Sequence, residues 1–536
     1  MHKWLPIAAL VLSVVVLAAH QGYLQPWTLD DAYITFRYSR NLAEGHGAVF
    51  NPGERVEGYT SFLWMAIMAA AHLVGANIVV ASKIVGGGVT LAWFAALAAA
   101  HRWIRGLDPL VTGAALALCG TVGLASRWSM SGMETPLVLF FVVVGLGLHL
   151  MERGGDERPW LPVLSGVVAA LAFMSRPDAG LLFGAIFLDR VLIQRRYDAR
   201  LLSFLAPFLL LGGGWWAARA WWYGWLLPNT FYVKVGSSVD QIKRGVEYFA
   251  AFAMPGWPLT TLFALGVWKG RLTERNPGLW TLVLFTVLHL LYVLMVGGDV
   301  FWGWRFMVVV TVPMAIIGAI GLADVVGFDR RPRLAWGALV LLVGFQTVYL
   351  NQSRKLNHRG WVARTGVLVG VWLDEHTDED ALIAVNIAGS IPYYAKRPTI
   401  DMLGLNDAHI AHTEVPNMGK GRAGHEKGDG EYVLSRAPDV VMLSSAKGGR
   451  RPRFRSDRLL FGLDDFHEQY TYKHYMVRED KRIGVYVRKE EYGGKGIHGV
   501  RPVKVFRDIR LEEDIHDGGA APGQGEQGEV EETEEE

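Results

Sequence analysis

The sequence predicts a mainly α-helical membrane protein that carries a small α/β domain towards its C-terminal end. Of its 536 residues, 51% are hydrophobic and only 19% are charged, against about 25% charged in typical soluble domains. Apolar segments recur as far as Leu350, after which the composition becomes polar. The formal net charge of +2 gives no sign of a nucleic-acid partner. The single cysteine, Cys119, excludes a disulfide framework.

The first apolar segment, residues 1–20, has the composition of either a secretory signal peptide or a retained membrane anchor. We favour the anchor, because many more apolar segments follow it. Lys3 near its start predicts a cytoplasmic N-terminus by the positive-inside rule. The loop that follows this segment is then expected on the outer side of the membrane.

Further apolar spans follow, several of them shorter than the roughly 20 residues that cross a bilayer. They lie at 79–100, 109–126, 135–151, 160–175, 178–192, 203–222, 250–268, 279–296, 306–326 and 335–350. The basic connecting loops between them are expected in the cytoplasm. These loops hold Arg102 and Arg105; Arg153 and Arg158; Arg190, Arg195, Arg196 and Arg200; Lys269, Arg271 and Arg275; and Arg330, Arg331 and Arg333.

One short apolar segment, 61–73, decides the predicted topology. If it crossed the membrane, every one of the basic loops would fall on the outer side, against the positive-inside rule. We therefore predict a re-entrant or interfacial helix on the outer side, packed over the preceding loop. The prediction is then about 11 transmembrane helices, with the N-terminus in the cytoplasm and the C-terminal part outside the membrane.

The segment 27–64 places two adjacent carboxylates, Asp30 and Asp31, at the water edge of the first span. Ionisable residues in such a position indicate a functional site. A plainer interpretation is that one of them caps a helix over 32–43. Because a single carboxylate suffices for a cap, we favour a chemical role for the pair.

The outer loops each combine charged and aromatic residues, whereas the inner loops are plain basic connectors. Taken singly, each of these residues also fits an interfacial or surface role. Together they predict one cavity at the outer ends of the helices. The charged residues expected around it are Asp30, Asp31, Glu134, Arg176, Asp178, Lys234, Asp299 and Arg305.

Several motifs occur in a fixed order within residues 1–460: DDAYITFRYSRNLAEGHGAVFNPGERVEGYTSFLW, GMET, RPD, LPNTFYVK, GGDVFWGWRF and IDMLGLND. Together they resemble the bacterial GT-C membrane glycosyltransferases, and within these the group that caps mycobacterial cell-wall arabinan with arabinofuranosyl residues. The resemblance implies a GT-C type bundle in the bacterial inner membrane with a periplasmic C-terminal domain. It also implies transfer of a sugar, arabinofuranosyl first, from a polyprenyl-phosphate donor to a cell-envelope glycan or glycoprotein.

An aspartate of the first loop is the catalytic base that this resemblance implies, and we assign Asp30 as the base with Asp31 in support. A carboxylate is ionised at neutral pH and can accept the proton of an acceptor hydroxyl. The leaving phosphate needs cations, and a Mg²⁺ or Mn²⁺ ion beside the carboxylates is left open. The expected substrate-binding residues are Arg37, Glu57, Tyr59, Glu134, Arg176, Asp178, Asn229, Lys234, Asp299, Arg305 and His425.

The predicted division of the chain is a membrane domain over 1–352, with its first periplasmic loop at 21–78, an α/β domain over 353–510 and an acidic disordered tail over 511–536. Strands are predicted within 381–394, 397–405 and 438–445, and a hairpin within 470–489. The glycine-rich stretch 419–430 lacks the spacings of phosphate-binding loops. We predict a mobile loop near the site, with His425 and Glu426 as acceptor contacts.

Two other classes of function compete with a transferase. A multi-span transporter or flippase for a lipid-linked or anionic substrate would also hold intramembrane carboxylates, but no internal repeat is visible and the acidic residues lie at helix ends. A catalytically inactive sugar-binding or assembly protein on the same scaffold is the third interpretation. No HExxH, Walker or GxSxG motif is present, so the energy for transfer would have to come with the donor.

Overall fold

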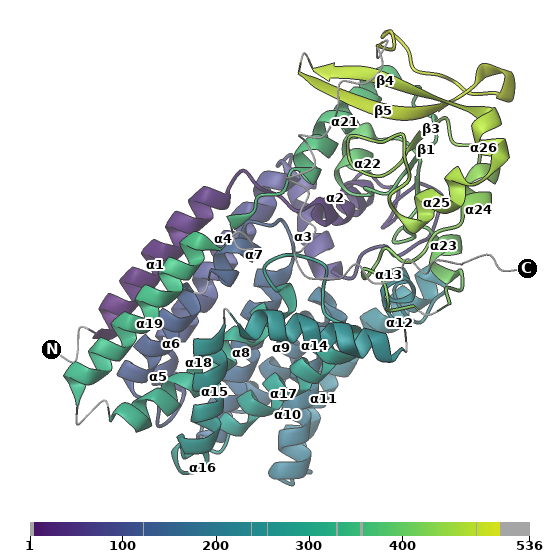
Figure 1. Cartoon of the computed structure of the whole chain (residues 1–536). Helices are drawn as coiled ribbons and strands as arrows, with labels where there is room; N and C mark the ends of the chain where they lie inside the picture. Colours follow the sequence, from purple (N-terminus) through teal and green to yellow (C-terminus); the bar gives the residue numbers. More distant parts are fainter. Residues whose placement is uncertain are drawn as a thin grey trace, which may run out of the picture.

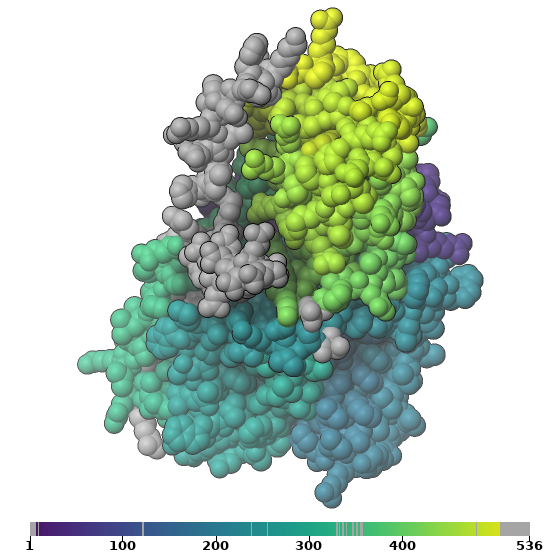
Figure 2. All heavy atoms as spheres, turned by 45° about the vertical axis from the view of Figure 1, so that its right-hand side comes forward, coloured from purple at the N-terminus to yellow at the C-terminus, as the bar shows by residue number. Residues whose placement is uncertain are grey.

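The computed structural model describes residues 5–503, except 122, 237, 255, 328–330, 354–356, 417 and 479. The predicted tail 511–536 lies outside the described residues. The helices that precede residue 353 form one bundle, and the later residues form a domain at one end of it (Figure 1). Figure 2 shows the green and yellow C-terminal residues seated directly on the teal and blue helices.

The bundle is built from apolar helices joined by short loops. Its principal helices are α1 (Leu5–Leu24), α4 (Ile78–Ala98), α6 (Pro109–Thr121), α7 (Leu124–Ser129), α8 (Thr135–Arg153), α9 (Trp160–Ser175), α10 (Leu181–Leu188), α11 (Ala199–Pro207), α12 (Gly214–Tyr223), α14 (Val239–Ala253), α15 (Trp257–Lys269), α17 (Leu279–Val296), α18 (Arg305–Val326) and α19 (Pro332–Gln352). Polar residues cap several of them; Asn77, for example, accepts a hydrogen bond from the Val80 amide at the start of α4.

Five described helical segments are long and apolar enough to cross a membrane, and the pair α14 and α15 adds a sixth if it is one bent span. The chain is therefore a multi-pass membrane protein. The predicted number of about 11 crossings is larger, and it stays a prediction. The predicted span 250–268 is wrong in its limits, because α14 and α15 meet at a bend of 97°.

Helix α18 is the centre of the bundle, and its most apolar stretch is entirely buried. It packs against α6, α15 and α17. The contact with α15 is close because Gly266 has no side chain: a Cβ atom there would lie 1.9 Å from the Ile317 carbonyl oxygen. This close approach fixes the second half of α18 against α15.

Two helices of the first loop lie between the bundle and the C-terminal domain: α2 (Asp30–Ala43) and α3 (Phe62–Leu73) (Figure 1). Helix α2 begins after Leu29, whose amide donates to the Ser131 carbonyl, so neither aspartate is its N-cap. The predicted segment 61–73 forms α3, which packs on α2. Its 12 residues span only about 18 Å, too short for a hydrocarbon core of about 30 Å.

The C-terminal domain contains a five-stranded sheet in the order β2-β1-β3-β5-β4. Strands β1 (Ile383–Val385), β2 (Thr399–Asp401) and β3 (Val440–Met442) are parallel, and the hairpin β4 (Tyr470–Arg478) and β5 (Lys481–Arg488) pairs antiparallel to β3. All five strands fall inside the predicted segments. Helices α21 (Val362–His376), α22 (Ser390–Ala395), α23 (Ala408–His412), α24 (Gly430–Ser435), α25 (Arg455–Phe461) and α26 (Asp464–Gln469) complete the domain.

Candidate active site

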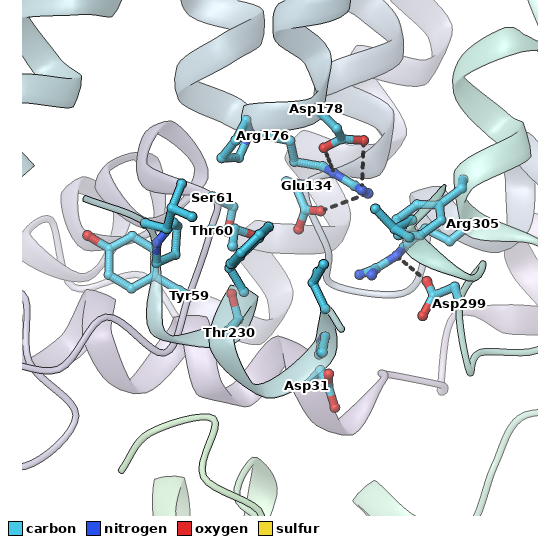
Figure 3. Close-up of a pocket in the computed structure, with 18 of the residues that line it drawn as sticks. Asp31, Tyr59, Thr60, Ser61, Glu134, Arg176, Asp178, Thr230, Asp299 and Arg305 are labelled. Atoms are coloured by element: carbon cyan, nitrogen blue, oxygen red, sulfur yellow. Dashed lines mark hydrogen bonds and ion pairs between the residues drawn. The ribbon is translucent and has the colours of Figure 1, made fainter. Parts of the chain in front are cut away.

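A cavity of about 600 Å³ lies where helix ends of the bundle meet the C-terminal domain. The first loop, the start of α8, the junction of α9 and α10, helix α13 (Asn229–Lys234) and the start of α18 all contribute to its wall, and Ala423 adds a residue from the C-terminal domain. Figure 3 shows side chains from these segments converging on one space. Of the eight charged residues predicted around one cavity, all except Asp30 line it.

Of the two adjacent aspartates at the start of α2, Asp31 lines the cavity (Figure 3). Its carboxylate makes no hydrogen bond or ion pair with any of the described residues. Burial raises the pKa of Asp31, and the positive charges of Lys234 and Arg305 oppose that shift. A carboxylate without a fixed partner, facing an open cavity, is available to accept a proton from a bound hydroxyl.

Asp30 does not line the cavity, because its carboxylate is bound by the C-terminal domain. It accepts hydrogen bonds from the amides of Gly389 and Ser390, at 3.2 and 3.0 Å, and from the Ser390 hydroxyl. A Cβ atom at Gly389 would lie 2.0 Å from the Asp30 carbonyl oxygen, so only glycine permits this approach. Burial raises the pKa of Asp30 to about 6 although these hydrogen bonds favour the ionised form. The structure thus leaves Asp31, and not Asp30, facing the cavity.

Arg176 lines the cavity, but its guanidinium is already held by two carboxylates. Its Nε and Nη2 donate to the Asp178 carboxylate at 2.9 and 3.0 Å, and its Nη1 lies 3.6 Å from Glu134 Oε1 (Figure 3). Arg305 is similarly paired, with its Nε 2.7 Å from Asp299 Oδ2. These five predicted residues all lie at the cavity, and their charges largely compensate each other.

Lys234, the last residue of α13, is the third predicted cation at the cavity. Among the described residues, none forms a hydrogen bond or an ion pair with its ammonium group. Among the described charged residues of the cavity wall, Asp31 and Lys234 are therefore unpaired, and the others form ion pairs.

Arg37 and Asn229 are predicted substrate contacts that the structure places outside the cavity. Arg37 is buried and donates to the carbonyls of Phe50, Pro392 and Arg397 and to the Asn51 side chain. The Asn229 amide donates to three carbonyls of residues 404–407. Both side chains fasten the membrane domain to the C-terminal domain.

Glu57 and His425 also lie beside the cavity rather than in its wall. Glu57 forms a buried ion pair with Arg219 of α12, and its Oε2 accepts from Arg219 Nε at 2.8 Å. His425 packs on the ring of Phe454, and burial lowers its pKa to about 4. Tyr59, in contrast, does line the cavity, and its hydroxyl lies 3.2 Å from that of Tyr223.

Two features of the cavity wall were not predicted from the sequence. Thr60, Ser61 and Thr230 bring hydroxyl groups to it (Figure 3), and these residues lie beside the predicted residues Tyr59 and Asn229. One side is apolar, and Phe173, Leu181, Phe208 and Trp216 line it. The hydroxyls were recognisable by their position in the motifs, but apolar residues within apolar spans carry no distinguishing signal.

Among the described residues, no group of three or more His, Cys, Asp and Glu side chains is placed to hold a metal ion. Three cavity carboxylates, Glu134, Asp178 and Asp299, are instead turned to arginines. The protein therefore offers no ready-made cage for Mg²⁺ or Mn²⁺ in these residues. Whether a divalent cation lies between the two aspartates and a bound phosphate stays open.

Comparison with known proteins agrees with the resemblance found in the sequence. The chain is 29% identical over 374 residues to a terminal β-(1→2)-arabinofuranosyltransferase of Corynebacterium glutamicum, a match that covers 62% of this chain and 52% of the relative. It is 28% identical over 265 residues to the protein of the same name from Mycobacterium tuberculosis, covering 47% of this chain and 41% of that one. The chain thus matches about half the length of these relatives or less. Residues 355–490 match a domain of unknown function, DUF8728.

Solved structures of membrane glycosyltransferases have the same fold. ArnT from Cupriavidus metallidurans bound to undecaprenyl phosphate matches with a TM-score of 0.55 at 14% identity, over 89% of this chain and 97% of ArnT. The oligosaccharyltransferase AglB from Archaeoglobus fulgidus, in complex with an inhibitory peptide and a dolichol-phosphate, matches with a TM-score of 0.53 at 11% identity, over 74% of this chain and 64% of AglB. The predicted GT-C fold class is confirmed.

Proposed function

We propose that this chain, on its GT-C fold, transfers a sugar, arabinofuranosyl first, from a polyprenyl-phosphate donor to a hydroxyl of a cell-envelope glycan or glycoprotein. The observation that carries the proposal is the pairing of charges in the cavity. Asp31 and Lys234 alone among its described charged residues have no fixed partner. They provide the base and the phosphate ligand that such a transfer needs.

In the proposed reaction, Asp31 accepts the proton of the acceptor hydroxyl as the hydroxyl oxygen bonds to the anomeric carbon of the sugar. The bond between that carbon and the donor phosphate oxygen breaks, and its electron pair stays with the phosphate. Lys234 stabilises the negative charge that develops there. The products are the glycosylated acceptor and polyprenyl phosphate, so no nucleotide takes part in the step.

The cavity wall suits both the prenyl chain and the sugar of such a donor. Phe173, Leu181 and Phe208 offer an apolar side for the first isoprene units. Thr60, Ser61 and Thr230 offer hydroxyls to the sugar (Figure 3). The relatives named arabinofuranosyltransferases and the ArnT structure with undecaprenyl phosphate support this choice of donor. They do not favour the transporter interpretation.

The proposal is tested by sugar transfer with the purified protein in nanodiscs. Polyprenyl-phosphate arabinofuranose is offered with a short arabinan acceptor, in parallel samples with Mg²⁺ and with EDTA. We expect the acceptor to gain one arabinose and polyprenyl phosphate to be released in equal amount. Failure to transfer any of a panel of polyprenyl-phosphate sugars would reject the proposed function.

We also propose that the C-terminal domain faces the periplasm, and cysteine labelling tests this. The sheet and the end of α10 lie at opposite ends of the molecule (Figure 1), and the natural Cys119 is buried. We expect an exposed Ser435→Cys to react with an impermeant maleimide in spheroplasts. Arg195→Cys, beyond the end of α10, should react only after the membrane is opened. The reverse pattern would invert the topology.

A further inference from the structure

The cavity has too little positive charge for the ligand proposed above. Its described charged lining consists of four carboxylates, Asp31, Glu134, Asp178 and Asp299, and three cations, Arg176, Lys234 and Arg305. Two of these cations are neutralised by their carboxylate partners. Lys234 alone would have to balance both the unpaired Asp31 and the incoming phosphate. A second unpaired cation near Lys234 is therefore needed, and the lining does not contain one.

The glycine-rich loop at 419–430 of the C-terminal domain lies directly against Lys234. Ala423 lines the cavity. A Cβ atom on Gly424, where φ is +73°, would lie only 3.4 Å from Cε of Lys234, so the loop passes close to the lysine side chain. Arg422 directly precedes Ala423 in this loop, so it lies one residue from the cavity wall.

The loop is held in place by its own carboxylate and by the membrane domain. Glu426 Oε1 accepts from the amides of Gly419 and Gly421, both at 2.8 Å. Arg244 of α14 donates to the Gly421 carbonyl at 2.9 Å and lies 3.5 Å from Glu426. Arg422 therefore extends from a backbone that is fixed on both sides of it.

The Arg422 side chain is exposed and forms no hydrogen bond or ion pair with any residue in the described ranges. Its charge interacts favourably with Asp31 and Asp299, both of which line the cavity, and unfavourably with Arg453. The guanidinium of Arg422 is thus unpaired among the described residues, and it interacts electrostatically with two carboxylates of a cavity whose described lining is one negative charge in excess.

We propose that Arg422 and Lys234 together bind the phosphate of the lipid-linked donor, and hold the same phosphate as it leaves. This inference rests on the proposed function. The planar guanidinium of Arg422 contacts two phosphate oxygens in the bidentate manner, whereas Lys234 acts as a point charge from the membrane side. The C-terminal domain then supplies a residue of the active site, in addition to the Ser390 contact that positions α2.

The test is equilibrium binding of decaprenyl phosphate to the full-length protein in nanodiscs of neutral phosphatidylcholine. The variants are Arg422→Ala, Arg422→Lys and, as a matched control, Arg450→Ala. Arg450 is also an exposed arginine of this domain, but its charge acts on Tyr472 and Tyr486 of the hairpin. We expect Arg422→Ala to weaken binding about ten- to a hundredfold, as for loss of a charged hydrogen-bonded contact. Arg422→Lys should lie between this variant and the wild type, and Arg450→Ala should bind as the wild type does.

Decaprenol, which lacks the phosphate, distinguishes phosphate recognition from a general disturbance of the loop. Its affinity should be the same for the wild type and Arg422→Ala; an equal loss for decaprenol and decaprenyl phosphate would overturn the proposal. Unchanged affinity of Arg422→Ala for decaprenyl phosphate would also overturn it. Displacement by inorganic phosphate at a similar concentration would show a free-phosphate site and contradict a lipid donor. If the wild type binds no polyprenyl phosphate at all, the proposed function itself fails.

Discussion

Replacing Asp31 by asparagine is expected to lower sugar transfer by about 10²-fold or more, the effect of losing a positioned general base. Asparagine has nearly the same shape but cannot accept the proton of the acceptor hydroxyl. Asp31 has no hydrogen-bonding or ionic partner among the described residues, so its replacement leaves no described group unpaired. Binding of polyprenyl phosphate and the temperature of thermal unfolding should therefore be retained. An Asp31→Asn protein with wild-type turnover would reject Asp31 as the base.

Asp30→Asn is the matched variant, because it makes the same chemical change one residue away. The amides of Gly389 and Ser390 donate to different carboxylate oxygens of Asp30, so in either orientation the NH2 group of an asparagine would face one of these N–H donors. We expect this variant to unfold at a lower temperature, whereas Asp31→Asn should not. Equal thermal stability of the two variants would contradict the separate roles assigned to the aspartates.

The pH dependence of transfer gives a second check on Asp31. Burial raises the pKa of this carboxyl group, and only its ionised form can act as the base. Activity should therefore fall as the pH is lowered through a pKa above the usual value of about 3.9 for aspartate. The measurement is kcat/KM against pH for the wild type. A profile that stays flat below the ordinary aspartate pKa would rule Asp31 out.

The second large effect is expected on stability, from Arg219→Met. Arg219 and Glu57 are both buried and form an ion pair that joins α12 to the first loop. Burial raises the pKa of Glu57 to about 7, although Arg219 opposes that shift. Without the arginine, a buried carboxylate has no counter-charge, which costs about 3–5 kcal/mol in the free energy of unfolding. Thermal unfolding in detergent, followed by tryptophan fluorescence, measures the loss.

The double variant Arg219→Met with Glu57→Leu is the control for this effect. Replacing a whole buried ion pair by apolar residues of similar volume is often neutral or stabilising. We therefore expect the double variant to recover most of the stability lost by Arg219→Met. If the single variant unfolds at the wild-type temperature, the ion pair does not contribute to the stability of the folded protein.

The helices and strands were predictable because their signals are local. The span predicted at 279–296 matches α17, Leu279–Val296, and the hairpin predicted at 470–489 contains β4 and β5. The span predicted at 250–268 failed because the apolar composition runs through the bend of 97° between α14 and α15. Composition reports which residues avoid water, but it does not report the direction of the backbone.

The candidate site was only partly predictable, because its details depend on residues far apart in the chain. Asp30 and Asp31 are equivalent in the sequence, and about 100° of helix rotation separates them. Which of them faces the cavity is decided by the loop at Gly389 and Ser390. Arg37 likewise binds backbone carbonyls more than 300 residues away, and carbonyl acceptors leave no pattern in a sequence.

The hydrogen bond between Asp30 and the amide of Ser390 also sets an order of events during biosynthesis. Its two ends are 360 residues apart, which a ribosome adding about 5–20 residues per second needs roughly 20 to 70 s to translate. During that time α2 already exists beside the membrane, but the loop that fixes its first turn has not been made. Sugar transfer is therefore expected to begin only after the C-terminal domain has emerged and docked, so a chain whose translation stops early leaves an inserted but inactive bundle.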